Sequence, residues 1–216
     1  MTRYTLSPMV PLRVFPWLLI LWLADPLLSF SSTEIAPGVH FHAAREGGNL
    51  GWVEFESFIL VIESGAAAEA RAVLEEIRAT SSKPVRYVFQ TQSRPDDSWA
   101  DSPFAAEGAT RIGQRQGMEE PLPAARANES GPRPAGPNRP GPVWLFDDRL
   151  VIEEASRRVE LLPLGPGLTR GDAVAWLPDE RILFTGGLCV NGAPRGLDRA
   201  YTAKWIDILT ELEQWG

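Results

Sequence analysis

The sequence predicts an α/β protein made of two strand-and-helix halves. Three observations lead to this prediction. An apolar run over residues 52–62 is followed by an amphipathic stretch over residues 66–80 and a second apolar run over residues 85–89. A further set of short apolar runs and a helical pattern come near the C-terminus. The length of 216 residues, of which 44% are hydrophobic and 23% are charged, fits one globular domain with a sizeable core.

The first 31 residues have the pattern of a secretory signal peptide. Two arginines precede an apolar run over residues 15–24, and Ser29 and Ser31 are small residues at the two positions that signal peptidase inspects. The run is about half of the roughly 20 residues that span a bilayer. We therefore expect cleavage before Ser32 and export to the periplasm or the exterior. An uncleaved segment would instead anchor the chain in the membrane.

The first half predicts a βαβ unit. Residues 52–62 begin with alternating apolar residues and end in a continuous apolar run, which is typical of a strand entering a buried sheet. Residues 66–80 predict a helix, and residues 85–89 predict a second strand that runs parallel to the first. One face of the helix carries the apolar residues Ala70, Val73, Leu74 and Ile77.

The second half predicts a strand, a hairpin and a closing helix. Residues 159–162 form the strand, and residues 173–177 and 181–185 form the hairpin around a turn at residues 178–180. The helix covers about residues 197–214. Its apolar face carries Tyr201, Trp205, Ile208 and Leu212.

A proline- and glycine-rich insert separates the halves at about residues 111–142, with seven prolines and five glycines. Proline lacks the amide donor and glycine loses much entropy on ordering, so the segment predicts a flexible insert within one domain over residues 32–216. A proline-rich ligand for a partner is the alternative. Asn128 to Ser130 also match a glycosylation acceptor, which matters only in a eukaryotic source.

Charge and composition exclude several functions. The net charge of −7 argues against binding to nucleic acid through phosphate, which leaves a small molecule or a protein as the partner. His40, His42 and Cys189 are the sequence's complete set of histidine and cysteine. A disulfide framework and a zinc site of the usual Cys/His kind are therefore excluded. We expect Cys189 to be a buried small hydrophobic residue.

Polar and glycine-rich loops follow the predicted strands, where α/β proteins place their ligands. At these residues the chain resembles the metallo-β-lactamase fold superfamily. The resemblance includes Glu63 to Gly65, where the family has an Asp-Thr-Gly type turn, together with residues 165–172 and 183–187. It covers most of the chain from Ile35 to about Trp215, apart from the insert. It implies a four-layer αββα sandwich of two similar halves.

The resemblance also implies that most metal ligands are missing. Active members bind two zinc ions through Thr-His-x-His-x-Asp-His, of which Asp96 is the only matching ligand here. The three histidine positions hold Gln92, Arg94 and Asp97. The histidine of Gly-His-Thr is Leu168, and the bridging aspartate of Gly-Asp is Gly187. The family's last histidine lies beyond the closing helix, so we expect the fold to be truncated at its C-terminus.

The degenerate site is expected to be lined by these six positions and by Trp99, whose other role would be core packing. Arg94 places a permanent positive charge where a histidine would face the metal, and we expect it to pair with Asp96 or Asp97. No cofactor is predicted, although the resemblance implies Zn²⁺ in active members. Without a metal-activated water, the family's hydrolysis has no nucleophile.

The remaining polar residues suggest other chemistry. His40 and His42 lie two apart in a predicted strand and face one side of it, which suits a metal pair or a surface strand, the second being favoured. Asp96, Asp97 and Asp101, with Glu63 or Asp172, could form a Ca²⁺ or Mg²⁺ site. Neither a glycosidase carboxylate pair nor a serine nucleophile is singled out.

Three functional hypotheses follow. The first is an exported, catalytically inactive protein with a metallo-β-lactamase-like fold, which acts as a binding or structural module. The alternative is a metal-dependent hydrolase with an atypical carboxylate-rich site around Asp96 and Asp97. The third is a paralogue without a selected function. Resemblance in fold alone does not decide among them.

Overall fold

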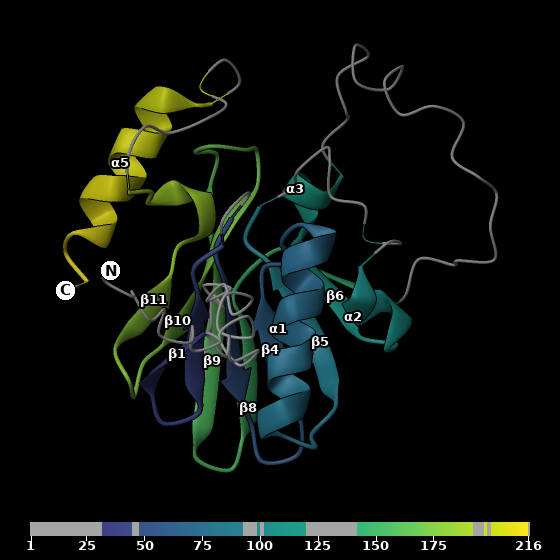
Figure 1. Cartoon of the computed structure of the whole chain (residues 1–216). Helices are drawn as coiled ribbons and strands as arrows, with labels where there is room; N and C mark the ends of the chain where they lie inside the picture. The colour runs from purple at the N-terminus through teal and green to yellow at the C-terminus, as the bar shows by residue number, and fades with distance from the viewer. Residues whose placement is uncertain are drawn as a thin grey trace, which may run out of the picture.

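The computed structural model describes residues 32–44, 48–92, 99, 102–119, 142–191, 197 and 200–215. The expected signal peptide and residues 120–141 of the expected insert lie outside this range. Two β-sheets face each other, and helices lie on their outer sides (Figure 1). Within the described residues, no helix is both long enough and apolar enough to cross a membrane.

The first sheet has seven strands whose spatial order follows their order in the sequence. Strands β1 to β4 pair antiparallel, and β4 to β7 pair parallel. The parallel pair β4 and β5 flanks helix α1, which confirms the predicted βαβ unit. The strands are β1 (Thr33–Ala36), β2 (Val39–His42), β3 (Leu50–Glu54), β4 (Ile59–Ile62), β5 (Val85–Gln90), β6 (Thr110–Gln114) and β7 (Val143–Phe146).

The second sheet has four antiparallel strands in the order β11-β10-β9-β8. Strands β10 and β11 form the predicted hairpin. The predicted strand over residues 159–162 lies inside β9, which is longer at both ends. The strands are β8 (Leu150–Glu154), β9 (Arg157–Gly165), β10 (Asp172–Leu177) and β11 (Ile182–Phe184).

Three separate cores show the four-layer αββα arrangement, which confirms the expected fold class. The inner core joins the two sheets, for example through Phe89 and Leu161. The second core joins the first sheet to α1 and α2, and the third joins the second sheet to α5. Each fully buried Val, Leu, Ile or Phe contributes about 1.5–3 kcal/mol to stability. The helical elements are α1 (Ala67–Thr80), α2 (Pro103–Ala106), α3 (Arg115–Met118), η2 (Gly186–Leu188) and α5 (Thr202–Leu212).

Helix α1 agrees closely with the prediction, because its buried residues are the four that were placed on its apolar face. Helix α5 begins later than expected, at Thr202. Trp205 and Ile208 are buried as predicted, but Tyr201 is 41% exposed, so its placement on the buried face is wrong. Tyr201 precedes the first helical turn, where its backbone carbonyl accepts from Trp205 and its N–H donates to Gly167.

Three further sequence predictions are corrected. The single strand over residues 52–62 is two antiparallel strands, β3 and β4, because the chain reverses at Phe55 to Phe58 and the Phe55 N–H donates to the Phe58 carbonyl at 2.8 Å. Residues 111–118, expected to open the insert, form β6 and α3. Cys189 is exposed rather than buried, since it follows η2 at the surface.

Candidate functional site

The candidate site lies at the carboxyl ends of β4 and β5. The chain turns after β4 through two residues with left-handed backbone, Glu63 at φ 70° and Gly65 at φ 62°. Glycine adopts this conformation freely, but for glutamate it costs about 1 kcal/mol or more. The Glu63 side chain compensates by accepting from the backbone N–H of Thr91 at 3.0 Å and from its hydroxyl. The turn after β4 is therefore fastened to the end of β5.

The residues that follow β5 are polar but buried. Gln90, Thr91 and Gln92 are each at most 4% exposed. The Gln90 amide donates to the Ser64 hydroxyl at 3.0 Å and accepts from the Arg111 guanidinium. The Thr91 carbonyl accepts from Ala173 of β10 at 2.7 Å, which joins the two sheets at this end. These hydrogen bonds satisfy the polar groups that burial takes from water.

Asp172, at the start of β10, holds the loop that carries Leu168. Its carboxylate accepts from the backbone N–H groups of Gly167, Leu168 and Thr169 at 2.6–3.1 Å and from the Thr169 hydroxyl. The side chain is only 1% exposed. Burial raises the pKa of Asp172, while these hydrogen bonds favour the ionised form and limit the increase.

Three positions that the resemblance assigns to metal ligands come together. A Cβ atom built on Gly187 would lie 2.7 Å from Leu168 Cδ2 and 3.0 Å from Gln92 Nε2. Gln92 follows the end of β5, Leu168 lies in the loop before β10, and Gly187 lies in helix η2. On its other side, η2 is covered by α5, since the Trp205 indole donates to the Leu188 carbonyl at 3.0 Å. Gln92, Leu168 and Gly187 therefore form one packed cluster, here called the ligand-position cluster.

The side chains of this cluster do not fit a zinc ion. Catalytic zinc takes three protein ligands, mostly imidazole, carboxylate or thiolate, and keeps an open position for water. Leu168 has no donor atom, Gly187 has no side chain, and the Gln92 amide is a weak ligand for zinc. Throughout the described parts of the chain, no group of three His, Cys, Asp or Glu side chains is close enough to hold a metal ion.

The other expected site residues divide into two groups. Arg94, Asp96, Asp97 and Asp101 lie outside the described residues, as do Ser93 and Ser98. The expected ion pair of Arg94 therefore stays a prediction. Trp99 is described, and it is 4% exposed in the core beneath α1 and α2, with the Arg111 guanidinium 5.8 Å from its ring centre. Core packing accounts for this tryptophan.

Glu63 and Asp172, the other carboxylates of the possible Ca²⁺ or Mg²⁺ site, both hold backbone N–H groups. Glu63 holds Thr91, and Asp172 holds the loop before β10. Neither carboxylate role was predicted from the sequence. The signal was nonetheless present, because Asp172 comes three residues after Thr169 at the end of a glycine-rich loop, a spacing at which a carboxylate can reach back to backbone N–H groups.

The two histidines lie on the α1 side of β2, as the two-residue spacing predicts. His40 stacks on Trp52 with ring centres 4.5 Å apart. His42 is 1% exposed, and its Nε2 lies 3.0 Å from a carboxylate oxygen of Glu69. The favoured prediction of a surface strand is therefore wrong for His42, because α1 covers this part of the sheet.

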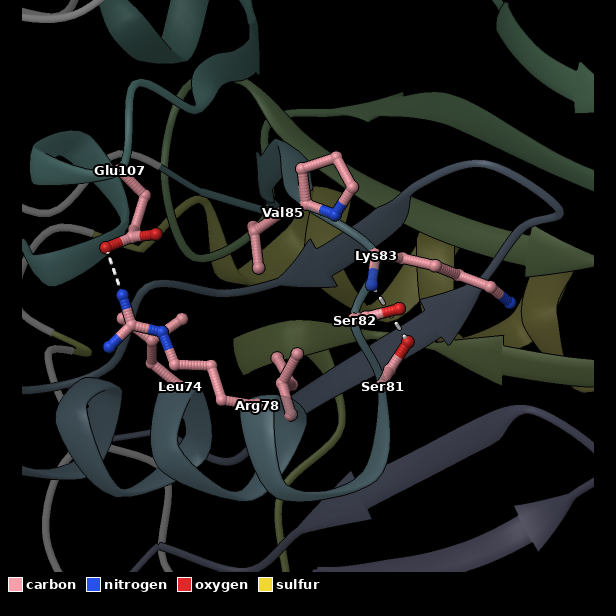
Figure 2. Close-up of a pocket in the computed structure, with 9 residues that line it drawn as sticks. Leu74, Arg78, Ser81, Ser82, Lys83, Val85 and Glu107 are labelled. Atoms are coloured by element: carbon pink, nitrogen blue, oxygen red, sulfur yellow. Dashed lines mark hydrogen bonds and ion pairs between the residues drawn. The ribbon is translucent and has the colours of Figure 1, made fainter.

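A surface pocket of about 270 Å³ lies at the opposite end of β5 from the ligand-position cluster. It is formed by the end of α1, the loop into Val85 and the residue after α2, and the Arg78 guanidinium pairs with Glu107 across it (Figure 2). The Lys83 ammonium, also at its edge, lies 3.2 Å from Glu54. None of the expected site residues lines this pocket.

No protein-family model and no curated protein matches the sequence. The fold is nevertheless similar to solved structures. A metallo-β-lactamase from Pontibacter korlensis superposes with a TM-score of 0.67 at 19% identity, over 85% of each chain. The DIM-1 metallo-β-lactamase superposes with a TM-score of 0.62 at 13% identity, over 86% of this chain and 84% of that one. DIM-1 exposed to ceftazidime gives 0.62 at 14% identity. The chain has the metallo-β-lactamase fold, and at these identities the likeness concerns the fold alone.

Proposed function

We propose that this protein is an exported, catalytically inactive member of the metallo-β-lactamase fold group that serves as a binding or structural module. The observation that carries the proposal is the ligand-position cluster. Gln92, Leu168 and Gly187 meet where the fold's metal ligands are expected, and together they offer one amide. Hydrolysis of the family's kind needs a metal-activated water, and these residues cannot hold that metal.

The packing of the cluster adds a second argument. A ligand at position 187 would need a side chain, but the space for its Cβ is already taken by Leu168 and by the Gln92 amide. Gly187 and Gln92 are also buried and Leu168 is partly buried, so the three residues fill the space between them. A site kept for metal would need an open coordination position for water or substrate.

Metal analysis tests the proposal. Protein purified without chelator should carry far less than one equivalent of zinc, manganese or calcium. Ester, thioester and lactam substrates should react at the buffer rate, with or without added zinc. Stoichiometric metal that is lost in Asp96→Ala would refute the proposal and favour the alternative, a hydrolase with a carboxylate-rich site around Asp96 and Asp97. Asp179→Ala, in the turn before β11, is a control that removes a carboxylate elsewhere.

Restoring the missing ligands tests the assignment of the positions. The variant combines Gln92→His, Arg94→His, Asp97→His, Leu168→His and Gly187→Asp. We expect it to gain zinc binding that calorimetry detects, because it supplies imidazole and carboxylate donors and replaces Gln92 and Leu168, the two side chains that fill the space for a Cβ at position 187. A folded variant that binds no divalent metal would contradict the assignment.

Export is the second part of the proposal. The arginines and the apolar run before Ser29 to Ser31 are typical of a signal peptide. A fusion of residues 1–31 to a reporter enzyme that is active only outside the cytoplasm should give activity. Replacing two leucines of the apolar run by arginine should abolish that activity. A fusion protein that is made but stays in the cytoplasm without reporter activity would refute export.

A further inference from the structure

We infer that Ser32 is the N-terminal residue of the mature protein and that its new α-ammonium group forms an ion pair with Glu76 of α1. The inference rests on the proposed export, and it adds to the expected cleavage before Ser32 a carboxylate that accepts the new N-terminus. The Ser32 nitrogen lies 3.0 Å from Glu76 Oε2. Signal-peptide patterns fix the cleavage site only by small residues, so the position of an acceptor on the folded domain is an independent observation.

The side chains of Ser32, His42, Glu69 and Glu76 form one group at this point, which we call the Ser32 anchor. The Ser32 hydroxyl lies 3.0 Å from His42 Nδ1, and His42 Nε2 lies 3.0 Å from Glu69 Oε2. Glu76 Oε1 lies 3.9 Å from His42 Nδ1. The anchor thus joins the start of β1, the end of β2 and one side of α1.

The anchor is largely shielded from water. His42 is 1% exposed, Glu69 is 17% exposed and Glu76 is 26% exposed. Two acidic side chains meet one imidazole there, so an added positive charge lowers the electrostatic energy of the group. The interaction is stronger than that of a fully exposed pair, because partial burial reduces screening by solvent.

Cleavage supplies that charge. Signal peptidase hydrolyses the peptide bond between Ser31 and Ser32. The hydroxyl of a water molecule goes to the Ser31 carbonyl, and the Ser32 nitrogen gains one proton to become an amine. An α-amine has a pKa of about 7.7–8.0, so at neutral pH it takes a second proton and becomes an ammonium. The donor to the Glu76 carboxylate thereby gains a positive charge, and the hydrogen bond becomes an ion pair.

The ion pair has a structural consequence. Among the strands of the described residues, β1 lies at the edge of the first sheet and pairs with β2 alone. Edge strands with few neighbours are prone to fraying. Fastening the first residue of the mature chain to α1 holds this edge strand in place.

The first experiment identifies the mature N-terminus. The full chain is produced in a bacterium with a periplasm, and the exported protein is analysed by N-terminal sequencing and intact mass. We expect a chain that begins at Ser32. A start at any other residue, or a retained leader, overturns the inference. Neither result bears on metal content, so the inactive-module proposal is judged separately.

The second experiment measures the ion pair. The chain that begins at Ser32 contains all the residues of the three cores. It is compared with the same chain acetylated at the Ser32 nitrogen, which keeps an N–H donor but loses the charge. Urea unfolding should give an unfolding equilibrium constant about fivefold larger for the acetylated chain. A factor of about five is the upper end of the range for ion pairs that are exposed to solvent, and this pair is partly shielded.

Substitutions on α1 locate the partner. Glu76→Gln should remove the difference between the free and acetylated chains. Glu75→Gln, at the exposed neighbouring position, should leave it unchanged. Equal stability of the free and acetylated chains, or a difference that persists in Glu76→Gln, overturns the inference.

Discussion

The substitution Gly187→Ala tests the geometry of the ligand-position cluster. The new methyl group would lie closest to Gln92 Oε1, and it would lie 2.7 Å from Leu168 Cδ2 and 3.0 Å from Gln92 Nε2. Carbon atoms in contact prefer a separation of about 3.5–4.0 Å, so the side chains of both Leu168 and Gln92 have to move, Leu168 by roughly 1 Å. Overpacking of this kind costs about 1–3 kcal/mol. We expect urea unfolding at constant pH to show a loss of stability in this range.

A double-mutant cycle separates this contact from other effects. In a Leu168→Ala background one of the two crowding side chains is removed while the Gln92 amide remains, so Gly187→Ala should cost less there than in the native protein. The coupling energy should be about 0.5–2 kcal/mol, as is usual for residues in contact. Effects of the two substitutions that add within about 0.5 kcal/mol would refute the reasoning, because independent sites add within that margin. A loss of stability below about 0.5 kcal/mol for Gly187→Ala alone would refute it as well.

Three further predictions concern the loops around the site and the charge of the protein. Gly171→Ala should cost about 3 kcal/mol or more, since its Cβ would lie 2.7 Å from the backbone Cα of Gly117 and a backbone cannot swing aside; thermal unfolding measures the loss. Burial raises the pKa of Asp172 above its ordinary 3.8. The protonated side chain therefore contributes to stability below pH 3.8, and this contribution is lost as the pH rises through the pKa that Asp172 has in the folded state. The native protein's stability relative to Asp172→Asn should therefore fall with rising pH, and a rise would mean that the hydrogen bonds outweigh burial. The hydrogen bond from the Ser57 hydroxyl lowers the pKa of Glu154 below its ordinary 4.5. The ionised carboxylate therefore stabilises the fold above pH 4.5, and this stabilisation is lost as the pH falls through the pKa that Glu154 has in the folded state. In Ser57→Ala, the free energy of unfolding should depend less on pH in this acidic range.

The sequence predicts those elements whose signal is local. Helix α1 is correct in its bounds and its buried face because its apolar residues follow the helical period without interruption. Strands β3 and β4 are merged in the prediction because the turn between them contains Phe55 and Phe58, which are buried, instead of glycine or proline. The edge strand β7 is missing from the prediction although its four residues are all apolar, because so short a run directly after the proline- and glycine-rich insert is a weak strand signal.

The site could be predicted only in part, for a different reason. Residues 92, 168 and 187 are far apart in the sequence, and no local pattern brings them together. The resemblance to the metallo-β-lactamase fold suggests that juxtaposition, and in the structure the three residues lie in contact. The roles of Glu63 and Asp172 were missed because their partners are backbone N–H groups. Such partners depend on the path of the chain, which the residue types do not reveal.

The parallel pairing of β6 and β7 constrains the length of the chain between them. Strand β6 ends at Gln114, strand β7 begins at Val143, and their register is fixed by four residue pairs. Two parallel neighbours cannot be joined by a tight turn, because the chain has to return along the length of the strand before the second one begins. The pairing therefore sets a lower limit on the number of residues between Gln114 and Val143, whatever their types.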